Sequence, residues 1–205
     1  MSGALEIEAN VSRETLARLE AYAALLEKWN PRINLVAPST IPDLWDRHIR
    51  DSLQVFDLAP ESPRLWVDLG SGGGLPGLVC AILAKEAVPE CRFVLIESDK
   101  RKAAFLMTVA RELSLTMDVL AQRAEHVGAL GADVVSARAL APLPQLLPLV
   151  ARHLTETGVA LLPKGKTYAE ELAAARLEWQ FAVTSHDSKT NASARILILK
   201  ELKRG

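Results

Sequence analysis

The sequence is poor in cysteine and has no long apolar run, and each shortage excludes a class of protein. Two cysteines among 205 residues are too few for a disulfide-stabilised secreted domain, and nothing around them has the spacing of zinc ligands. The apolar runs are shorter than the roughly 20 residues of a membrane span, and the N-terminus is acidic where a secretory signal is basic. We therefore expect a cytoplasmic protein that uses no membrane and no metal, with Cys80 and Cys91 as buried thiols.

A strong charge of one sign is also missing. The formal net charge is −1 and the pI is about 6.4, so the charge of the whole chain does not indicate a nucleic-acid partner. The charges are unevenly distributed. Residues 1–62 hold six Lys or Arg against ten Asp or Glu, and residues 163–205 hold eight against five. The basic side of the molecule is predicted in the second region, with Lys164, Lys166, Arg195, Lys200, Lys203 and Arg204.

A glycine-rich turn follows an apolar run that ends near Asp68. Five glycines lie between positions 70 and 77, and those spaced for a ligand-binding turn are Gly70, Gly72 and Gly74. Glycine permits positive φ and a close approach of the backbone to a ligand, and the spacing fits a dinucleotide pyrophosphate as well as other nucleotides. Asp68 would repel a pyrophosphate but suits S-adenosylmethionine, whose amino group and sulfonium are positive. We therefore predict that this turn and Asp68 bind S-adenosylmethionine.

A second acidic residue ends the next predicted strand, Cys91–Ile96. Glu97 stands at the carboxyl end of that strand, where open parallel sheets bind their ligands. An acid in this place accepts both hydrogen bonds of a ribose diol, in NAD enzymes and in methyltransferases alike. Glu97 therefore indicates an adenosine-type ligand and leaves the choice between the two classes open.

Strands and helices alternate along the rest of the chain. Further strands are predicted at Thr116–Leu120, Asp133–Ser136 and Val159–Pro163, and helices at about Leu75–Lys85, Ala124–Leu130, Leu143–His153 and Tyr168–Leu177. This alternation predicts an α/β fold with a doubly wound, mostly parallel sheet. The β-like runs Gln180–Ser185 and Ala194–Leu199 predict a closing antiparallel hairpin. That ending is typical of the Rossmann-like class I S-adenosylmethionine-dependent methyltransferases, whereas a second βαβ half would favour a dehydrogenase.

A helical extension precedes the sheet. Apolar residues repeat at helical spacing from Leu16 to Trp29, and Asn30-Pro31 is expected to end this helix. A second helix, from about Pro42 to Leu58, places two polar residues three positions apart on one face, and the polar series includes His48, Asp51 and Ser52. We divide the chain into an N-terminal helical extension, residues 1–62, and a methyltransferase domain, residues 63–205, in one compact unit.

Five segments carry a resemblance to a known family. In chain order they are WNPRINLVAPSTIPDLWDRHIRDSL, VDLGSGGGLPGL, LIESDKRKAAFL, VVSARALAPL and LLPKGK. Together they resemble the ribosomal RNA small subunit methyltransferase G family, also called glucose-inhibited division protein B, from about Trp29 to the C-terminus. The resemblance implies transfer of a methyl group from S-adenosylmethionine to N7 of a guanine in 16S rRNA, number 527 in the usual rRNA numbering, beside the decoding centre. The resemblance also implies that the partner is 16S rRNA, within the small ribosomal subunit or an assembly precursor.

The resemblance also transfers site residues. Gly70 and Leu75 match the family's cofactor turn, and Ala124-Glu125 match its adenine contact. The family shares three polar residues of the N-terminal extension, for which catalysis and packing at the mouth of the cofactor site are both open. These residues are His48, Asp51 and Ser52.

The resemblance implies roles in substrate binding or catalysis for three basic residues. Arg138 matches the arginine of the family's S-R-A segment, although in this chain the serine stands one place earlier, at Ser136. Lys164 matches the lysine that follows the fifth strand, and Arg195 matches the arginine that opens the last strand. Lys164 and Arg195 are expected to contact RNA, and Arg138 and Lys164 are the predicted catalytic residues.

Missing motifs narrow the reaction independently of the family. SARALAPL follows the fourth predicted strand, where an exocyclic-amine methyltransferase would carry N/D-P-P-Y/F, and neither cysteine is placed for the covalent attack that cytosine C5 requires. Guanine N7 needs neither device, because its lone pair is free and no proton must leave. Positioning and charge can therefore suffice, with Arg138 hydrogen-bonded either to guanine O6 or to the cofactor carboxylate.

Two other functions fit parts of the sequence. A NAD-dependent oxidoreductase would use the same glycine spacing, but Asp68 disfavours it. A catalytically silent RNA- or ribosome-binding module could keep the fold, but the intact glycine turn disfavours that hypothesis. Binding of NAD, or binding of RNA without S-adenosylmethionine, would distinguish these alternatives.

Overall fold

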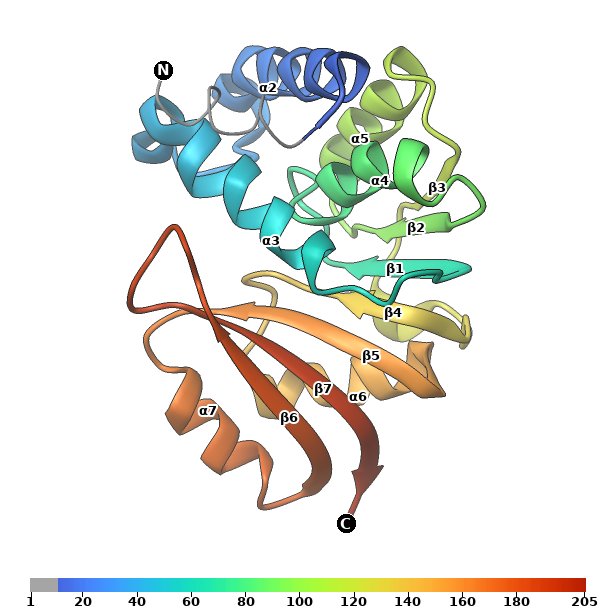
Figure 1. Ribbon diagram of the computed structural model, residues 1–205, viewed down its shortest axis with the longest axis vertical. Helices are drawn as coiled ribbons and strands as arrows, with labels where there is room; N and C mark the ends of the chain where they lie inside the picture. The colour runs from blue at the N-terminus through green and yellow to red at the C-terminus, as the bar shows by residue number, and fades with distance from the viewer. Residues whose placement is uncertain (1–10) are drawn as a thin grey trace.

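The computed structural model describes residues 11–205, and its centre is a seven-stranded sheet (Figure 1). The order across the sheet is β3-β2-β1-β4-β5-β7-β6. The first five strands in this order run parallel, while β7 runs antiparallel to both of its neighbours. The predicted doubly wound sheet with a closing antiparallel hairpin is confirmed. The strands are β1 (Leu65–Leu69), β2 (Arg92–Ile96), β3 (Met117–Leu120), β4 (Ala132–Ser136), β5 (Leu154–Lys164), β6 (Trp179–Asp187) and β7 (Arg195–Arg204).

Helices cover both faces of the sheet (Figure 1). Helices α2, α3, α4 and α5 contribute to one hydrophobic core, and α6 and α7 contribute to the other. The helices are α2 (Arg13–Ile33), α3 (Asp51–Asp57), α4 (Gly77–Ala87), α5 (Lys100–Glu112), α6 (Leu143–His153) and α7 (Tyr168–Ala175). Short helical segments are η1 (Pro38–Asp43), η2 (Trp45–Arg50) and η3 (Ala124–His126).

The central strands are buried because both faces of the sheet are covered. Along β1, Trp66 lies in the core shared with α4, and Val67 lies in the core on the opposite face. The Trp66 ring stacks between Phe56 of α3 and Phe93 of β2, with centroid distances of 6.3 Å and 5.4 Å. This stack joins the helical extension to the sheet below the carboxyl end of β1.

Helix α2 is longer than its sequence predicts. It runs through Pro31 to Ile33, so the expected end at Asn30-Pro31 is wrong. Pro31 stands in the exposed last turn, where one lost i to i−4 hydrogen bond is tolerated, and Asn34 in the left-handed conformation (φ 51°) ends the helix. The Asn30 side chain accepts a hydrogen bond from the Val36 N–H at 2.9 Å and fixes the chain that leaves the helix.

The predicted helix Pro42–Leu58 is divided into three segments. A 3-10 turn, η1, precedes the π-helical segment η2, and α3 continues from Asp51. Pro42 has no N–H to donate, and the wider π turn changes the direction in which the following side chains point. Likewise, the expected helix Ala124–Leu130 is only the 3-10 turn η3.

Cys80 and Cys91 are free and buried, as expected from the sequence. Within residues 11–205, no helix has the length and apolar character to cross a membrane. Over the same range, no three acidic, histidine or cysteine side chains are grouped so as to hold a metal ion.

Candidate active site

The glycine turn connects β1 to α4 and has a backbone that only glycine adopts easily. Gly70, Gly72 and Gly74 have φ values of +63°, +54° and +93°. A Cβ on Gly70 would lie 2.5 Å from Leu140 Cδ1, and one on Gly74 would lie 2.4 Å from Leu78 Cδ1. The turn is therefore a close-packed backbone loop at the carboxyl end of β1, where the sequence predicts the cofactor.

Glu97 lies beside this turn and holds it. One of its carboxylate oxygens accepts a hydrogen bond from the Gly72 N–H at 2.7 Å, and the other accepts one from the Asp99 N–H at 2.7 Å. Asp99 in turn caps α5 by accepting a hydrogen bond from the Arg101 N–H at 2.8 Å. A carboxylate has about four acceptor positions, so Glu97 can hold the turn and still accept from a ribose diol.

Asp68 lies under the turn and is 1% exposed. One carboxylate oxygen accepts a hydrogen bond from Ser136 Oγ at 2.6 Å, and the Trp66 ring N–H donates to the same hydroxyl at 2.8 Å. Among the described residues, the other oxygen, Oδ2, has no hydrogen-bond partner. Burial raises the pKa of Asp68 to about 6, although the Ser136 hydroxyl opposes this shift. Oδ2 lies against the start of α4, 2.7 Å from where a Cβ of Gly77 would stand, so a buried acidic group lies directly beneath the glycine turn.

Helix α2 supports the turn from the opposite side. The Tyr22 hydroxyl donates to the Gly73 carbonyl at 2.6 Å, and Leu35 lies 3.3 Å from where a Cβ of Gly73 would stand. Burial raises the pKa of Tyr22 well above its usual value, so the phenol stays protonated as a donor. The sequence marks Tyr22 only as one member of an apolar helical stripe, and no local signal distinguishes it from a core residue.

The remaining predicted cofactor residues lie at the same edge of the sheet. Leu75 is buried at the end of the turn. Ala124 and Glu125 form part of η3, which follows β3, the strand next to β2. Ala124 is buried with its carbonyl 3.2 Å from His153 Nε2, and Glu125 is exposed. Their contact with an adenine stays a prediction.

Arg138 follows β4 and meets two polar residues of the N-terminal extension. Arg138 Nη1 lies 3.3 Å from an oxygen of Asp51, and Arg138 Nη2 lies 3.2 Å from His48 Nδ1. The Arg138 and Asp51 side chains are 18% and 17% exposed, so water only partly screens the pair. Residues that are 87 and 90 positions apart in the chain are thus brought together.

The hydrogen bonds of His48 define its tautomer. Arg138 can only donate, so Nδ1 of His48 must be the acceptor and Nε2 must carry the proton. Nε2 then donates to Thr40 Oγ1 at 2.7 Å, and the Thr40 hydroxyl donates to the Ala37 carbonyl at 2.7 Å. Burial, together with the positive charges of Arg138 and Arg47, lowers the pKa of His48 to about 4. His48 is therefore a neutral acceptor for Arg138 at pH 7.

Ser52 points away from this cluster. Its hydroxyl donates to the His48 carbonyl at 2.8 Å, one helical turn back, and the residue is 1% exposed. The thiol of Cys80 approaches the Ser52 carbonyl at 3.9 Å. The three polar residues of the extension therefore separate into two that face Arg138 and one that packs against α4.

Lys164 ends β5 and holds the loop that follows β4. Its ammonium donates to the Ala141 carbonyl at 2.8 Å and to a Glu171 oxygen at 2.9 Å, and the side chain is 8% exposed. Glu171 also accepts from the Leu143 N–H at 2.8 Å. Burial opposes the shift, but these hydrogen bonds lower the pKa of Glu171. Two of the three ammonium protons of Lys164 are thus used within the protein.

Arg195 opens β7 beside this pair. Its guanidinium donates to the Ala192 and Ala194 carbonyls, bonds Asp187 at 2.8 Å and lies 5.4 Å from the centre of the Tyr168 ring. Of the other predicted basic residues, Arg204 bonds Glu178 at 3.2 Å near the far end of the same strand. Of the basic residues predicted in the C-terminal region, Lys164 and Arg195 therefore lie at the site, whereas Lys200, Lys203 and Arg204 lie further along β7.

A cavity of about 790 Å³ connects these side chains. It lies at the carboxyl ends of β4 and β5, and its polar lining includes Asp51, Arg138, Lys164, Glu171, Asn191 and Arg195. Leu140, which is 40% exposed, lies between this cavity and Gly70. The cavity is therefore next to the glycine turn.

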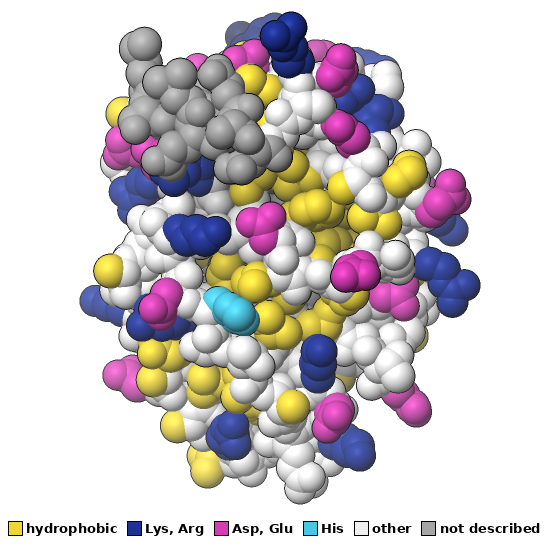
Figure 2. Space-filling view, viewed as in Figure 1, with side chains coloured by type: hydrophobic (Ala, Val, Ile, Leu, Met, Phe, Trp, Pro, Cys, Tyr) yellow, Lys and Arg dark blue, Asp and Glu magenta, His cyan; other side chains and the backbone are white. Residues whose placement is uncertain are grey.

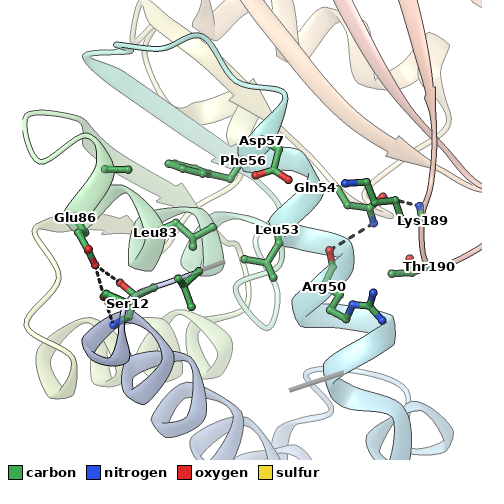
Figure 3. A pocket seen from close by; sticks show the side chains of 13 residues that line it. Ser12, Arg50, Leu53, Gln54, Phe56, Asp57, Leu83, Glu86, Lys189 and Thr190 are labelled. Atoms are coloured by element: carbon green, nitrogen blue, oxygen red, sulfur yellow. Dashed lines mark hydrogen bonds between the residues drawn. The ribbon is translucent and has the colours of Figure 1, made fainter. Parts of the chain in front are cut away.

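A second cavity, of about 870 Å³, lies on the other side of α3 (Figure 3). Ser12 and Glu86 face each other at one end, and Gln54 and Lys189 meet at the other. Thr190 lines both cavities. This second cavity contains none of the residues that the sequence predicts for the site.

Charges of both signs are mixed on the face of the molecule that Figure 2 shows. Figure 2 shows basic and acidic side chains interspersed on one face, with apolar side chains gathered near its middle. This arrangement agrees with a net charge of −1. Recognition of an anionic partner would therefore depend on local side chains, such as those of the cavity, more than on a broad positive field.

The sheet order, with a glycine turn after β1 and an antiparallel last strand, is that of the class I S-adenosylmethionine-dependent methyltransferase fold. A family model described as rRNA small subunit methyltransferase G matches residues 15–197. The chain belongs to this family. A ribosomal RNA small subunit methyltransferase G of Cereibacter sphaeroides is 54% identical over 94% of this chain and 93% of its own length. A protein of the same name from Rhodospirillum centenum is 57% identical over 94% and 87%.

Solved structures of lower sequence identity share the fold. M. jannaschii TYW2 in complex with AdoMet superposes with a TM-score of 0.56 at 14% identity, covering 77% of this chain and 76% of that one. The T. thermophilus 16S rRNA N2 G1207 methyltransferase, in complex with AdoMet and guanosine, gives 0.54 at 15% identity, covering 74% and 38%. Both likenesses concern the fold alone.

Proposed function

We propose that this protein transfers a methyl group from S-adenosylmethionine to N7 of a guanine in 16S rRNA. The single observation that carries the proposal is the position of Arg138, in a cavity next to the glycine turn and beside Lys164 and Arg195. An arginine has five N–H donors, and among the described residues Arg138 uses two, toward Asp51 and His48. The remaining donors suit guanine O6, the acceptor next to N7.

The polar groups of the cavity favour a reaction that needs no base. Within residues 11–205, the acids lining the cavity are already engaged, Asp51 with Arg138 and Glu171 with Lys164. His48 uses its free lone pair to accept from Arg138. Guanine N7 attacks with a lone pair that carries no proton, so positioning and charge are sufficient.

Cofactor binding is assigned to the glycine turn and the acids beside it. S-adenosylmethionine supplies an activated methyl group on a positive sulfonium. The turn from Gly70 to Leu75 would pack against the cofactor, Glu97 would accept from its ribose, and Asp68 would favour its positive end. Ala124 and Glu125 would border the adenine.

The substrate side is assigned to the basic residues around the cavity. Arg138 would orient the guanine, while Lys164, with one ammonium proton left, and Arg195 would contact the RNA backbone. Because their other donors are already used, these two residues would recognise the RNA from fixed positions. The partner is 16S rRNA in the small ribosomal subunit or an assembly precursor, and the expected location is the cytoplasm.

The test is transfer of labelled methyl from S-adenosylmethionine to small ribosomal subunits that lack their own N7-methylguanine. Nucleoside analysis of the product should show labelled N7-methylguanosine, and subunits that already carry the modification should accept none. Another methylated nucleoside would refute the assigned atom. RNA binding without cofactor binding would favour a silent module, and binding of NAD in its place would favour an oxidoreductase.

A further inference from the structure

The loop between β6 and β7 docks on the helical extension. The Lys189 N–H donates to Gln54 Oε1 at 2.7 Å, and the Thr190 hydroxyl donates to Asp51 Oδ1 at 3.0 Å. The Ser188 hydroxyl lies 3.4 Å from the same oxygen of Asp51, and Ser188 is 8% exposed. In Figure 1 this loop extends from the sheet toward the segment that contains η2 and α3. Asp51 thus bonds two residues that follow it by 137 and 139 positions in the chain.

The two oxygens of Asp51 have different partners. Oδ1 accepts from the loop hydroxyls, and Oδ2 accepts from Arg138 at 3.3 Å. A carboxylate held on one oxygen cannot rotate freely, so the loop hydroxyls determine where Asp51 presents the other oxygen. Thr190 and Arg138 are therefore linked through the Asp51 side chain. The geometry of the bond between Arg138 and Asp51 depends on the bond between Thr190 and Asp51.

Arg138 needs this restraint because the residues that follow it in its own loop make few contacts that could orient its side chain. Its side chain has many rotamers, and the next residues, Ala139 and Leu140, are exposed. Ala139 has a φ of +54°, which is uncommon for a residue with a Cβ, so no regular structure extends the strand here. The two contacts that orient the guanidinium, with Asp51 and His48, both come from outside the loop.

We propose that Thr190 is a positioning residue that holds Arg138 through Asp51, and that the Ser188 hydroxyl, 3.0 Å from the Thr190 hydroxyl, supports it. This inference rests on the proposed function, in which Arg138 orients the guanine. The same loop contributes Asn191 and Ala194 to the cavity wall. One loop thus both borders the substrate and holds the arginine that orients it, so that seating of the substrate and placement of Arg138 are coupled.

Three single variants test the role of the hydroxyl. Thr190→Val keeps the shape of the side chain without its hydroxyl, and Thr190→Ser keeps the hydroxyl. Ser193→Ala is the matched control, because it removes a hydroxyl of the same loop that, among residues 11–205, bonds Asn191 and not Asp51. For Thr190→Val we expect a roughly tenfold lower kcat on small subunits, the effect of one hydrogen bond to a charged group. Thr190→Ser and Ser193→Ala should keep wild-type kcat.

Two further measurements distinguish a role in orienting Arg138 from a general loss of stability or of cofactor binding. Affinity for S-adenosylmethionine and the melting temperature should be nearly the same in all three variants, because the side chains that the loop bonds on the helical extension are Asp51 and Gln54, outside the glycine turn. Side-chain ¹⁵N relaxation of Arg138 should show a more mobile guanidinium in Thr190→Val alone. In an Asp51→Asn background, the further change Thr190→Val should lower kcat much less than it does in the wild type.

The outcomes distinguish this inference from the proposed function. If the wild-type protein methylates subunits at guanine N7 and Thr190→Val matches it in both kcat and Arg138 mobility, the positioning role is refuted and the proposed function stands. If the wild-type protein does not methylate, the proposed function fails. The ¹⁵N measurement needs no RNA, so it then still decides whether the loop holds Arg138.

Discussion

The glycine turn and the Arg138 cluster lie at the same edge of the sheet but are built in different ways. The turn is a continuous stretch whose shape comes from its backbone, with three glycines at positive φ. The cluster consists of side chains from three separate regions, the N-terminal extension, the loop after β4 and the β6–β7 loop. The first is sensitive to any added atom, whereas the second is sensitive to the loss of single hydrogen bonds.

The largest expected effect comes from adding one carbon to the turn. Gly74→Ala would place Cβ 2.4 Å from Leu78 Cδ1 at a φ of +93°. We expect a loss of about 2–4 kcal/mol in the free energy of unfolding, from strain and overpacking, and no detectable cofactor binding by calorimetry. Gly128→Ala is the control, since nothing lies within 4 Å of its Cβ. Normal binding by Gly74→Ala would show that the turn is not the cofactor site.

Removing the charge at the centre of the cluster should have the next largest effect. Arg138→Ala is expected to lower kcat about 100-fold, as loss of a transition-state hydrogen-bond donor does, with cofactor affinity within about twofold of wild type. The comparison is Arg92→Ala, whose guanidinium makes an exposed ion pair with Asp118. A large loss of cofactor affinity in Arg138→Ala would instead indicate that this arginine binds the cofactor carboxylate. The glycine turn and the Arg138 cluster would then both belong to the cofactor site.

A pH titration tests the turn through Asp68. Its pKa is raised to about 6, so the carboxylate becomes neutral as the pH falls through that value. The affinity for positively charged S-adenosylmethionine should then fall by up to about tenfold between pH 7 and pH 5. Asp68→Asn should bind weakly at both values, with no pH dependence in this window. A wild-type affinity independent of pH would contradict a charge role for Asp68.

The same shift predicts how stability varies with pH. A carboxyl group whose folded pKa lies above its unfolded pKa contributes to stability below the unfolded value, near pH 4. This contribution should be lost as the pH rises toward 6. Denaturant unfolding at pH 4 and pH 6 can measure it as the difference between the wild type and Asp68→Asn.

The smallest effect on cofactor binding is expected for Tyr22, which supports the turn from behind. Tyr22→Phe removes the donor to the buried Gly73 carbonyl and should lower the free energy of unfolding by about 1–3 kcal/mol. The cofactor should still bind, with an affinity reduced a few-fold. Tyr168→Phe is the control because Tyr168 contributes its ring to Arg195. If both variants unfold alike in urea, the contact does not support the turn.

The difference between the two regions also determines what the sequence can predict. Strand and helix order, the glycine turn and Glu97 follow from local patterns, since each depends on residues that are adjacent or regularly spaced. The end of α2 does not follow from its sequence, because proline usually breaks a helix and Pro31 does not. It stands in an exposed last turn, where the lost hydrogen bond costs little.

The Arg138 cluster could be predicted only in part. The helical spacing placed His48 and Asp51 on one face, but nothing local indicated that Arg138 would lie against them. No sequence pattern indicates that the hydroxyls of Ser188 and Thr190 contact Asp51, because both residues stand in a polar loop where serine and threonine are common. Contacts that require three folded segments cannot be found from spacing within one segment.

The dependence of Asp51 on the β6–β7 loop has a consequence for the order of synthesis. A chain is made from its N-terminus, so Asp51 and Arg138 emerge long before Thr190 and the last strand. If the loop holds the arginine as proposed, the site is complete only when the final strand has joined the sheet.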